Sequence, residues 1–502
     1  MMNLIENELK KKENTIKTEN GAIGYKTSNS ALVDLNYQVS SLRNATKEEI
    51  IALFDKAYYE DKKYTLKWLF FARDIQEGMG ERRLFRICYK RFMELDNRLA
   101  SINLYNITKY GRWDDLVSLI GEDSYFDYTI TSIIKTQLKE DLNNLKENKP
   151  ISLLGKWLPS ENASSKETKA LAKKVRKLLE MTPREYRLML SKLRKYLNVV
   201  EVNACAKKWD EIDYERVPSL ANLKYKDAFL KNDYERRVEY LNSVKKGEKK
   251  LNMKVSTPVD IVSRYTSDLF RKTKEYDETL ELAWKNLKDI FIENTLVVAD
   301  GSGSMLIPVG GRTTALDVAN ALAIYTSEHN KGVYKNKYIT FSSSPQFVTF
   351  KDDNTLEEKL QIAFEHNEVS NTNIEKVFKL ILDIAVVNKV SKDDMIKNVL
   401  IISDMEFDRA QDTYMKDGLT RSLFEEIGKK YEMAGYKLPK LIFWNVNSRT
   451  KAIPLTENEL GVTLISGFSQ NVLKMVMSNK YNPYEVLIEM LDSERYYGIV
   501  NE

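Results

Sequence analysis

The amino-acid sequence predicts an N-terminal, helical-repeat-like all-α array followed by a doubly wound α/β domain. The chain has 502 residues, more than a single hydrophobic core usually supports. Up to about residue 290, apolar residues recur at helical spacing between short turns with glycine or proline. Beyond residue 294, apolar strands alternate with amphipathic helices. We therefore expect a partly ordered leader over 1–30, a basic helical domain over 31–290 and an α/β domain over 291–502.

Composition narrows the class of protein. Hydrophobic residues make up 43% and charged residues 30% of the chain, which indicates a globular rather than a disordered protein. No apolar run is long enough to cross a membrane and no signal-peptide pattern is present, so we expect a cytoplasmic protein without a membrane partner. The two cysteines, Cys88 and Cys205, are too few to stabilise a chain of this length through disulfide bonds. His329 and His366 leave little material for a zinc site or a histidine-based catalytic centre.

Helix-start signals place the helices of the first part. Thr46 and Glu49 form a capping box, and Thr182 is an expected N-cap with Pro183 in the first helical position. Helices are expected from 46 and over 66–75, 126–147, 166–180, 182–197 and 224–242, with one or two further helices over 257–291. A glycine-broken turn over 72–86 joins two of them. Its arginines, Arg73, Arg82, Arg83 and Arg86, either pair with Asp74, Glu77 and Glu81 or contact phosphate, and we favour the pairing.

Basic residues are concentrated in the first part. The net charge is +5, with lysine and arginine in excess before residue 290 and acidic residues in excess after it. The segment 161–210 is especially basic, and its charges lie mostly off the apolar faces of two predicted helices. Such a surface suits a polyanion such as RNA, and the alternative is an ordinary solvated surface. The expected phosphate contacts are Lys169, Lys173, Lys174, Lys177, Lys192, Arg194 and Lys195.

The second part alternates strand and helix signals. Strands are expected over 295–300, 338–341, 346–350, 398–404, 440–446 and 462–465. Helices are expected over 313–330, 356–366, 374–388, 424–432, 473–477 and 483–491. This alternation predicts a mostly parallel sheet, which binds ligands beyond the carboxyl ends of its strands at a topological switch point.

Two fully apolar strands of this sheet end in an aspartate, at Asp300 and at Asp404. Glycines alternate with Asp300, Ser302 and Ser304, so the backbone folds tightly and their oxygens converge. Small oxygen ligands suit Mg²⁺, or Mn²⁺ in its place. The alternative is an ordinary loop in which the aspartate caps a helix. No nucleophile is paired with a base here, so we expect no enzyme and no catalytic residues.

The sequence Asp300-x-Ser302-x-Ser304 after a buried strand resembles the metal-ion-dependent adhesion site of von Willebrand factor A domains. The resemblance implies that Thr372, from a second loop, and Asp404 complete the ligand set. Ser370-Asn371 stand where that family usually carries glycines. The resemblance to the metal-ion-dependent adhesion site also implies that a carboxylate of a protein partner completes the metal shell.

Three motifs of the first part carry a second resemblance: Gly78-x-Gly80-Glu81-Arg82, Lys156-Trp157-x-Pro159 and Val217-Pro218-Ser219. They resemble the domain-of-unknown-function 2828 family, which joins a helical part to an A-type domain. The two-part plan is similar to that of the Ro autoantigen, whose ring of helical repeats binds RNA. The resemblances imply a Ro-like ribonucleoprotein scaffold that binds RNA through its helices and a Mg²⁺-dependent ligand through its A-type domain. The alternative is a Mg²⁺-dependent protein-binding adaptor without RNA.

Overall fold

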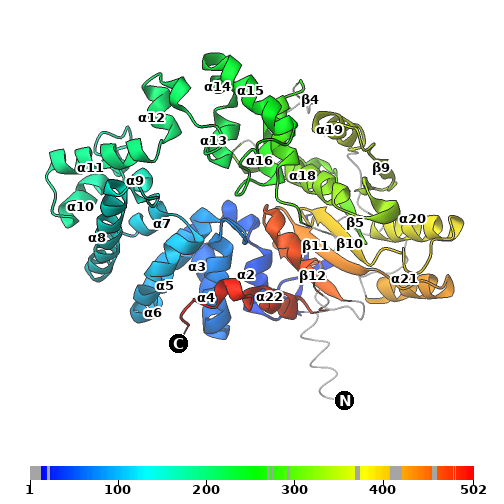
Figure 1. Cartoon of the computed structure of the whole chain (residues 1–502). Helices are drawn as coiled ribbons and strands as arrows, with labels where there is room; N and C mark the ends of the chain where they lie inside the picture. The colour runs from blue at the N-terminus through cyan, green and yellow to red at the C-terminus, as the bar shows by residue number, and fades with distance from the viewer. Residues whose placement is uncertain are drawn as a thin grey trace. The chain divides into compact units, whose positions relative to one another are not determined.

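A computed structural model describes residues 13–19, 23–267, 272–273, 275–290, 294–311, 313–367, 373–406, 421–454, 461–476, 478, 480 and 482–501. The chain divides into two compact units (Figure 1). Unit 1 comprises Met1–Thr65 and Ser256–Ser493, and unit 2 comprises Leu66–Val255 and Glu494–Glu502. The predicted fold class is confirmed, because an all-helical array and an α/β domain are both present.

Unit 1 is built around a sheet with the strand order β12-β11-β10-β5-β8-β9. Its strands are β5 (Thr295–Asp300), β8 (Lys337–Phe341), β9 (Phe347–Thr349), β10 (Asn398–Ser403), β11 (Lys440–Asn445) and β12 (Val462–Ser466). All pairings are parallel except β8–β9, which is antiparallel. All six positions of β5 are buried, as expected for an apolar strand covered on both faces. The predicted strands are therefore confirmed, and β8 and β9 form an antiparallel hairpin.

Helices flank this sheet. They are α2 (Ala31–Tyr37), α3 (Lys47–Glu60), α16 (Pro258–Tyr265), α17 (Glu278–Lys285), α18 (Ala315–Glu328), α19 (Leu356–Glu365), α20 (Ile374–Val387), α21 (Arg421–Met433) and α22 (Pro483–Leu491). The helix α18 packs on β5 and β8. The segment predicted as helix over 473–477 forms a 3-10 helix, η5 (Gln470–Met475). Short two-stranded ribbons complete the unit: β1 (Thr15–Lys17) with β2 (Ile23–Tyr25), β3 (Thr266–Ser267) with β4 (Lys272–Thr273), and β6 (Pro308–Gly310) with β7 (Thr313–Thr314).

The N-terminal helix α2 packs against β12, at the end of the sheet (Figure 1). The Ser40 hydroxyl donates to the carbonyl oxygen of Asn445 at 3.0 Å, and the Asn445 amide donates to the carbonyl oxygen of Tyr37 at 2.9 Å. These contacts tie the residues before Thr65 to the sheet. The compact units consequently part at 65/66 and 255/256, whereas the sequence places its boundaries at 30/31 and 290/291.

Unit 2 is all-helical in its described residues. Its helices are α4 (Lys62–Arg73, which begins in unit 1), α5 (Arg82–Leu95), α6 (Asn97–Tyr110), α7 (Trp113–Val117), α8 (Ser124–Lys146), α9 (Leu154–Trp157), α10 (Lys166–Leu178), α11 (Pro183–Tyr196), α12 (Val200–Cys205), α13 (Ser219–Lys224), α14 (Lys226–Asn232) and α15 (Tyr234–Lys245). The predicted capping box is present at Thr46 with Glu49, and Thr182 is the N-cap of α11 with Pro183 in its first turn, as predicted. Glu185 adds a second capping box at Thr182. The helix predicted over 224–242 is divided at Asp233, whose extended φ of −149° interrupts it.

Three arginines of the turn over 72–86, Arg73, Arg82 and Arg86, pair with carboxylates, as favoured, but with Asp114 and Asp115 in place of the acidic residues of the turn. Arg73 Nε donates to Asp115 Oδ2 and Arg86 Nε donates to Asp115 Oδ1, both at 2.8 Å. Asp115 is fully buried. Burial opposes its ionisation, but the two guanidinium groups hold the pKa of Asp115 below its ordinary value. The arginines therefore hold the helices of this junction together, and Asp74 pairs with a different residue.

That partner is Arg495, near the C-terminus of the chain. Arg495 Nε donates to Asp74 Oδ2 at 2.7 Å, and Nη2 donates to Oδ1 at 2.9 Å. Close by, the backbone N–H of Val500 donates to Asn103 Oδ1 at 3.1 Å. The last residues of the chain are thereby bound into unit 2.

Among the described helices, none combines the length and the apolar character that crossing a membrane requires.

Candidate functional site

The carboxyl ends of β5 and β10 bring one group of polar side chains together. We call this group the strand-end cluster: Asp300, Ser302, Ser304, Ser403 and Asp404. The parallel register places Ala299 beside Ile402, so the residues that follow each strand emerge side by side. This point lies at the centre of the sheet, where the chain turns from β5 to β8 on one side and later to β10 on the other. It is the switch point at which such sheets bind ligands.

Asp300 is held by two donors. The backbone N–H of Ser302 donates to Oδ1 at 2.9 Å, and the hydroxyl of Ser403 donates to Oδ2 at 2.6 Å. The hydroxyl oxygens of Ser302 and Ser304 lie 3.0 Å apart, at the start of the 3-10 helix η3 (Gly303–Leu306). Three of the predicted ligands are therefore adjacent, on the loop that the alternating glycines predicted.

Asp404 follows β10 and faces the same loop. The Ser304 hydroxyl hydrogen-bonds to its carboxylate. Arg449 Nη1 donates to Asp404 Oδ2 at 3.0 Å. Asp300 is 2% exposed and Asp404 1% exposed. Burial, reinforced by the charge of Asp404, raises the pKa of Asp300 to about 7, and burial also raises the pKa of Asp404.

The oxygen atoms of this cluster fit a divalent cation. Two buried carboxylates and two hydroxyls are hard oxygen donors, and the raised pKa values mean that their present partners leave negative charge under-compensated. Within the described part of the chain, no group of three or more His, Cys, Asp or Glu side chains could hold a metal, so hydroxyls are needed for a site here. Thr372, the remaining predicted ligand, lies outside the described residues.

Arg449 and Glu406 are the residues of this region that sequence reasoning missed. The Glu406 carboxylate accepts the backbone N–H groups of Arg449 and Thr450 at 2.7 and 2.9 Å. The other arm of the Arg449 guanidinium contacts Glu19 at 2.7 Å. Glu406 lies close to Asp404 in the sequence, which is only a weak signal that it belongs to the same site. Arg449 lies 45 residues beyond Asp404, and no local motif marks it.

The basic surface of unit 2 lies on α10 and α11. Six of the seven predicted phosphate contacts are exposed on these two helices: Lys169, Lys173, Lys174, Lys177, Lys192 and Lys195. Lys174 lies 3.6 Å from the carboxylate of Asp127. The lysines therefore stand on two helices that follow each other in the chain, as predicted.

Arg194 differs from these lysines. Its half-buried guanidinium donates to the carbonyl oxygens of Gly155 and Leu158 at 3.0 and 2.7 Å, and to the hydroxyl of Ser160 at 2.7 Å. These bonds hold α9 and the loop after it against α11. Arg194 therefore has a structural role in unit 2, which its place among the expected phosphate contacts did not indicate.

Comparison with known proteins decides the family. The family model described as Domain of unknown function (DUF2828) matches residues 18–121 and 122–294, more than half of the chain. The chain belongs to the DUF2828 family. A second model, Domain of unknown function (DUF7788), matches residues 294–495, the region of the α/β fold. The resemblance drawn from the motifs of the first part is thus confirmed.

Two individual proteins are similar to this DUF2828 chain. An uncharacterized protein of Acanthamoeba polyphaga mimivirus is 31% identical over 95% of this chain and 87% of its own length. The crystal structure of the Deinococcus radiodurans Ro (RSR) protein aligns with 90% of this chain and 92% of its own, at 13% identity and a TM-score of 0.36. A likeness at that score carries no argument about function.

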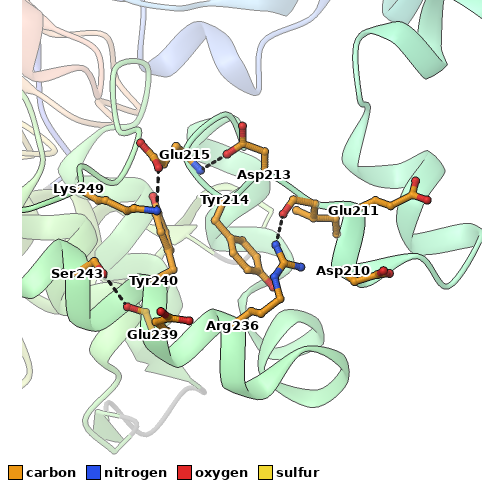
Figure 2. A pocket seen from close by; sticks show the side chains of 11 residues that line it. Asp210, Glu211, Asp213, Tyr214, Glu215, Arg236, Glu239, Tyr240, Ser243 and Lys249 are labelled. Atoms are coloured by element: carbon orange, nitrogen blue, oxygen red, sulfur yellow. Dashed lines mark hydrogen bonds and ion pairs between the residues drawn. The ribbon is translucent and has the colours of Figure 1, made fainter.

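The helical unit of this DUF2828 protein also holds an acidic pocket of about 470 Å³ (Figure 2). Its carboxylates are Asp210, Glu211, Asp213, Glu215 and Glu239. Lys249 pairs with Glu215 at 3.0 Å, and Arg236 binds the carbonyl oxygen of Ile212 at 2.8 Å. Negative charge prevails in this pocket, so it repels phosphate.

Proposed function

We propose that unit 1 binds Mg²⁺ or Mn²⁺ at the strand-end cluster and thereby holds a carboxylate of a protein partner. The observation that carries the proposal is the meeting of Asp300 and Asp404, two buried carboxylates with raised pKa values, beside two serine hydroxyls. Asp300, Ser302 and Ser304 would contact the ion, with Asp404 acting directly or through water. Thr372 stays a predicted ligand.

The residues around the cluster position these donors. Ser403 and the backbone of Ser302 fix both oxygens of Asp300. Arg449 fixes Asp404, and the Glu406 carboxylate in turn holds the backbone of Arg449. Donors held in place before a ligand arrives lose less conformational entropy when it binds. When bound, the cation supplies a positive centre for a partner oxygen.

Calorimetric titration with Mg²⁺ and with Mn²⁺ tests this function. Asp300→Ala should abolish binding, whereas Asp393→Ala, an exposed aspartate of the same unit, should bind as the parent does. Because an ion that binds only the folded protein stabilises it, Mg²⁺ should also raise the melting temperature of the parent but not of Asp300→Ala. Equal affinity in the parent and Asp300→Ala would refute the site.

We also propose that the lysines of α10 and α11 bind RNA, which would make the chain a scaffold with two kinds of ligand. Their exposure on consecutive helices supports this proposal. The alternative is a Mg²⁺-dependent protein-binding adaptor without RNA. Titration of the full chain with single-stranded RNA at several salt concentrations separates the two, because only phosphate contacts give a steep salt dependence.

A further inference from the structure

A second pocket of unit 2, of about 600 Å³, lies along α11. We call it the α11 pocket. Its wall is formed by α11 itself, by the loop over 160–162 and by Val202 of α12. A pocket of this volume falls in the range of small-molecule sites. It is distinct from the strand-end cluster, which belongs to unit 1.

Three arginines of one helix line the α11 pocket. Arg184, Arg187 and Arg194 are spaced by three and seven residues, which places them on one face of α11. Arg184 and Arg187 are exposed, and neither guanidinium forms a hydrogen bond or ion pair with any residue in the described part of the chain. Arg194 is instead fixed by one bond to α9 and two bonds to the loop after it. The pocket thus combines one immobilised cation with two available ones.

The only carboxylate among the described residues that line the pocket is Glu161. It is engaged by Arg176, whose Nε donates to it at 2.8 Å. Arg176 therefore largely offsets its charge, and the three arginines keep the pocket positive. Ser160 and Ser191 add hydroxyl donors, while Leu190 and Val202 add apolar surface. An anion with an apolar or aromatic body matches this lining.

We infer that the α11 pocket binds a terminal phosphate, with the attached nucleoside against Leu190 and Val202. Guanidinium groups match phosphate oxygens with two parallel hydrogen bonds, and a phosphate monoester offers three such oxygens and nearly two charges. A phosphodiester within a strand carries one charge and suits an open surface better than a pocket. The phosphate comes from a free nucleotide or from the end of an RNA. Only the second source rests on the proposed RNA binding.

The experiment uses the full chain and four probes. These are adenosine monophosphate, adenosine, and one short oligoribonucleotide with or without a 5′ phosphate. Affinities are compared for the parent, for the double variant Arg184→Gln/Arg187→Gln and for Lys231→Gln, at an exposed position of α14 in the same unit. Arg184 and Arg187 are exposed, so the double variant should fold, and its melting temperature serves as the check.

We expect the parent to bind a phosphorylated probe about tenfold more tightly than its unphosphorylated partner, as hydrogen bonds to charged groups provide. The double variant should lose that preference, and Lys231→Gln should keep it. A preference confined to the monophosphate identifies a free nucleotide as the ligand, and one confined to the oligonucleotide identifies an RNA end. If the parent binds adenosine monophosphate but neither oligoribonucleotide, the proposed RNA binding is refuted and the inference about the α11 pocket stands. Absence of any phosphate preference in the parent, or its persistence in the double variant, refutes the inference.

Discussion

The Ser403 hydroxyl donates a hydrogen bond of 2.6 Å to Asp300 Oδ2 across the seam between β10 and β5. Both residues are almost fully buried. The bond connects the last residue of one strand to the last residue of its neighbour, and so fixes the carboxylate that the proposed cation site depends on most.

Ser403→Ala should weaken Mg²⁺ binding by about tenfold, because partners that orient a metal ligand typically contribute 10- to 100-fold to affinity. It should also lower the free energy of unfolding by about 1–3 kcal/mol, since one oxygen of Asp300 loses its donor. Calorimetry and chemical denaturation measure the two effects. Ser344→Ala, an exposed serine of the same unit, should change neither.

Reversing lysine charges on α10 and α11 should weaken RNA binding and flatten its salt dependence. For each phosphate that the protein no longer neutralises, the log–log slope should fall in magnitude by roughly 0.7 on single-stranded RNA. The variant carries Lys169→Glu, Lys173→Glu and Lys192→Glu, and all RNA sequences should be affected about equally. Lys429→Glu, on an exposed position of α21 in unit 1, is the control. An unchanged affinity in the triple variant would leave the adaptor function alone.

Gly155→Ala should destabilise unit 2. A Cβ at this position would lie 2.6 Å from the Cβ of Leu193, so α9 and α11 would be forced apart. Overpacking of this kind costs about 1–3 kcal/mol. Gly428→Ala in α21 is the matched control, because the nearest atom to its Cβ is 4.0 Å away. That variant should gain about 0.5–1 kcal/mol, since glycine is unfavourable within a helix.

The capping box of α3 should make stability depend on acid pH. The backbone N–H of Thr46, followed by Lys451, lowers the pKa of Glu49 to about 2 from its ordinary 4.5. A carboxyl whose pKa is lower in the folded than in the unfolded protein stabilises the fold fully above pH 4.5. That contribution is lost as the pH falls from 4.5 towards 2.

Denaturation of the parent and of Glu49→Gln at several pH values tests this. The parent should be the more stable above pH 4.5, and the difference should shrink as the pH falls. Glu185 is the third residue of α11, as Glu49 is of α3, and the backbone N–H of Thr182 likewise lowers its pKa. Glu185→Gln should therefore show the same trend, whereas a pH-independent difference in both variants would contradict the prediction.

Sequence reasoning succeeded where the signal is local. The apolar run before Asp300, the capping box at Thr46, the N-cap at Thr182 and the strand ending at Asp404 are each encoded within a few neighbouring residues. The placement of Asp300 beside Asp404 could be predicted because parallel strands align their carboxyl ends.

The remaining features depend on contacts between distant parts of the chain. Arg449 reaches Asp404, and Arg73 reaches Asp115, over separations that no local pattern encodes. The role of Arg194 was misjudged because helical periodicity places a side chain on a face but does not show what an adjoining loop offers it. Thr372 stays a prediction, because it lies outside the described residues.

Unit 2 interrupts unit 1 in the chain, since unit 1 comprises residues before 66 and again from 256 to 493. During synthesis, α2 cannot pack against β12 until nearly the whole chain has been made. Most of unit 2 emerges meanwhile, yet its bonds from Arg495 to Asp74 and from Val500 to Asn103 form only at the end. A fragment that begins at residue 291 would lack α2, α3, α16 and α17, so excising the α/β fold intact requires joining two separate stretches of the gene.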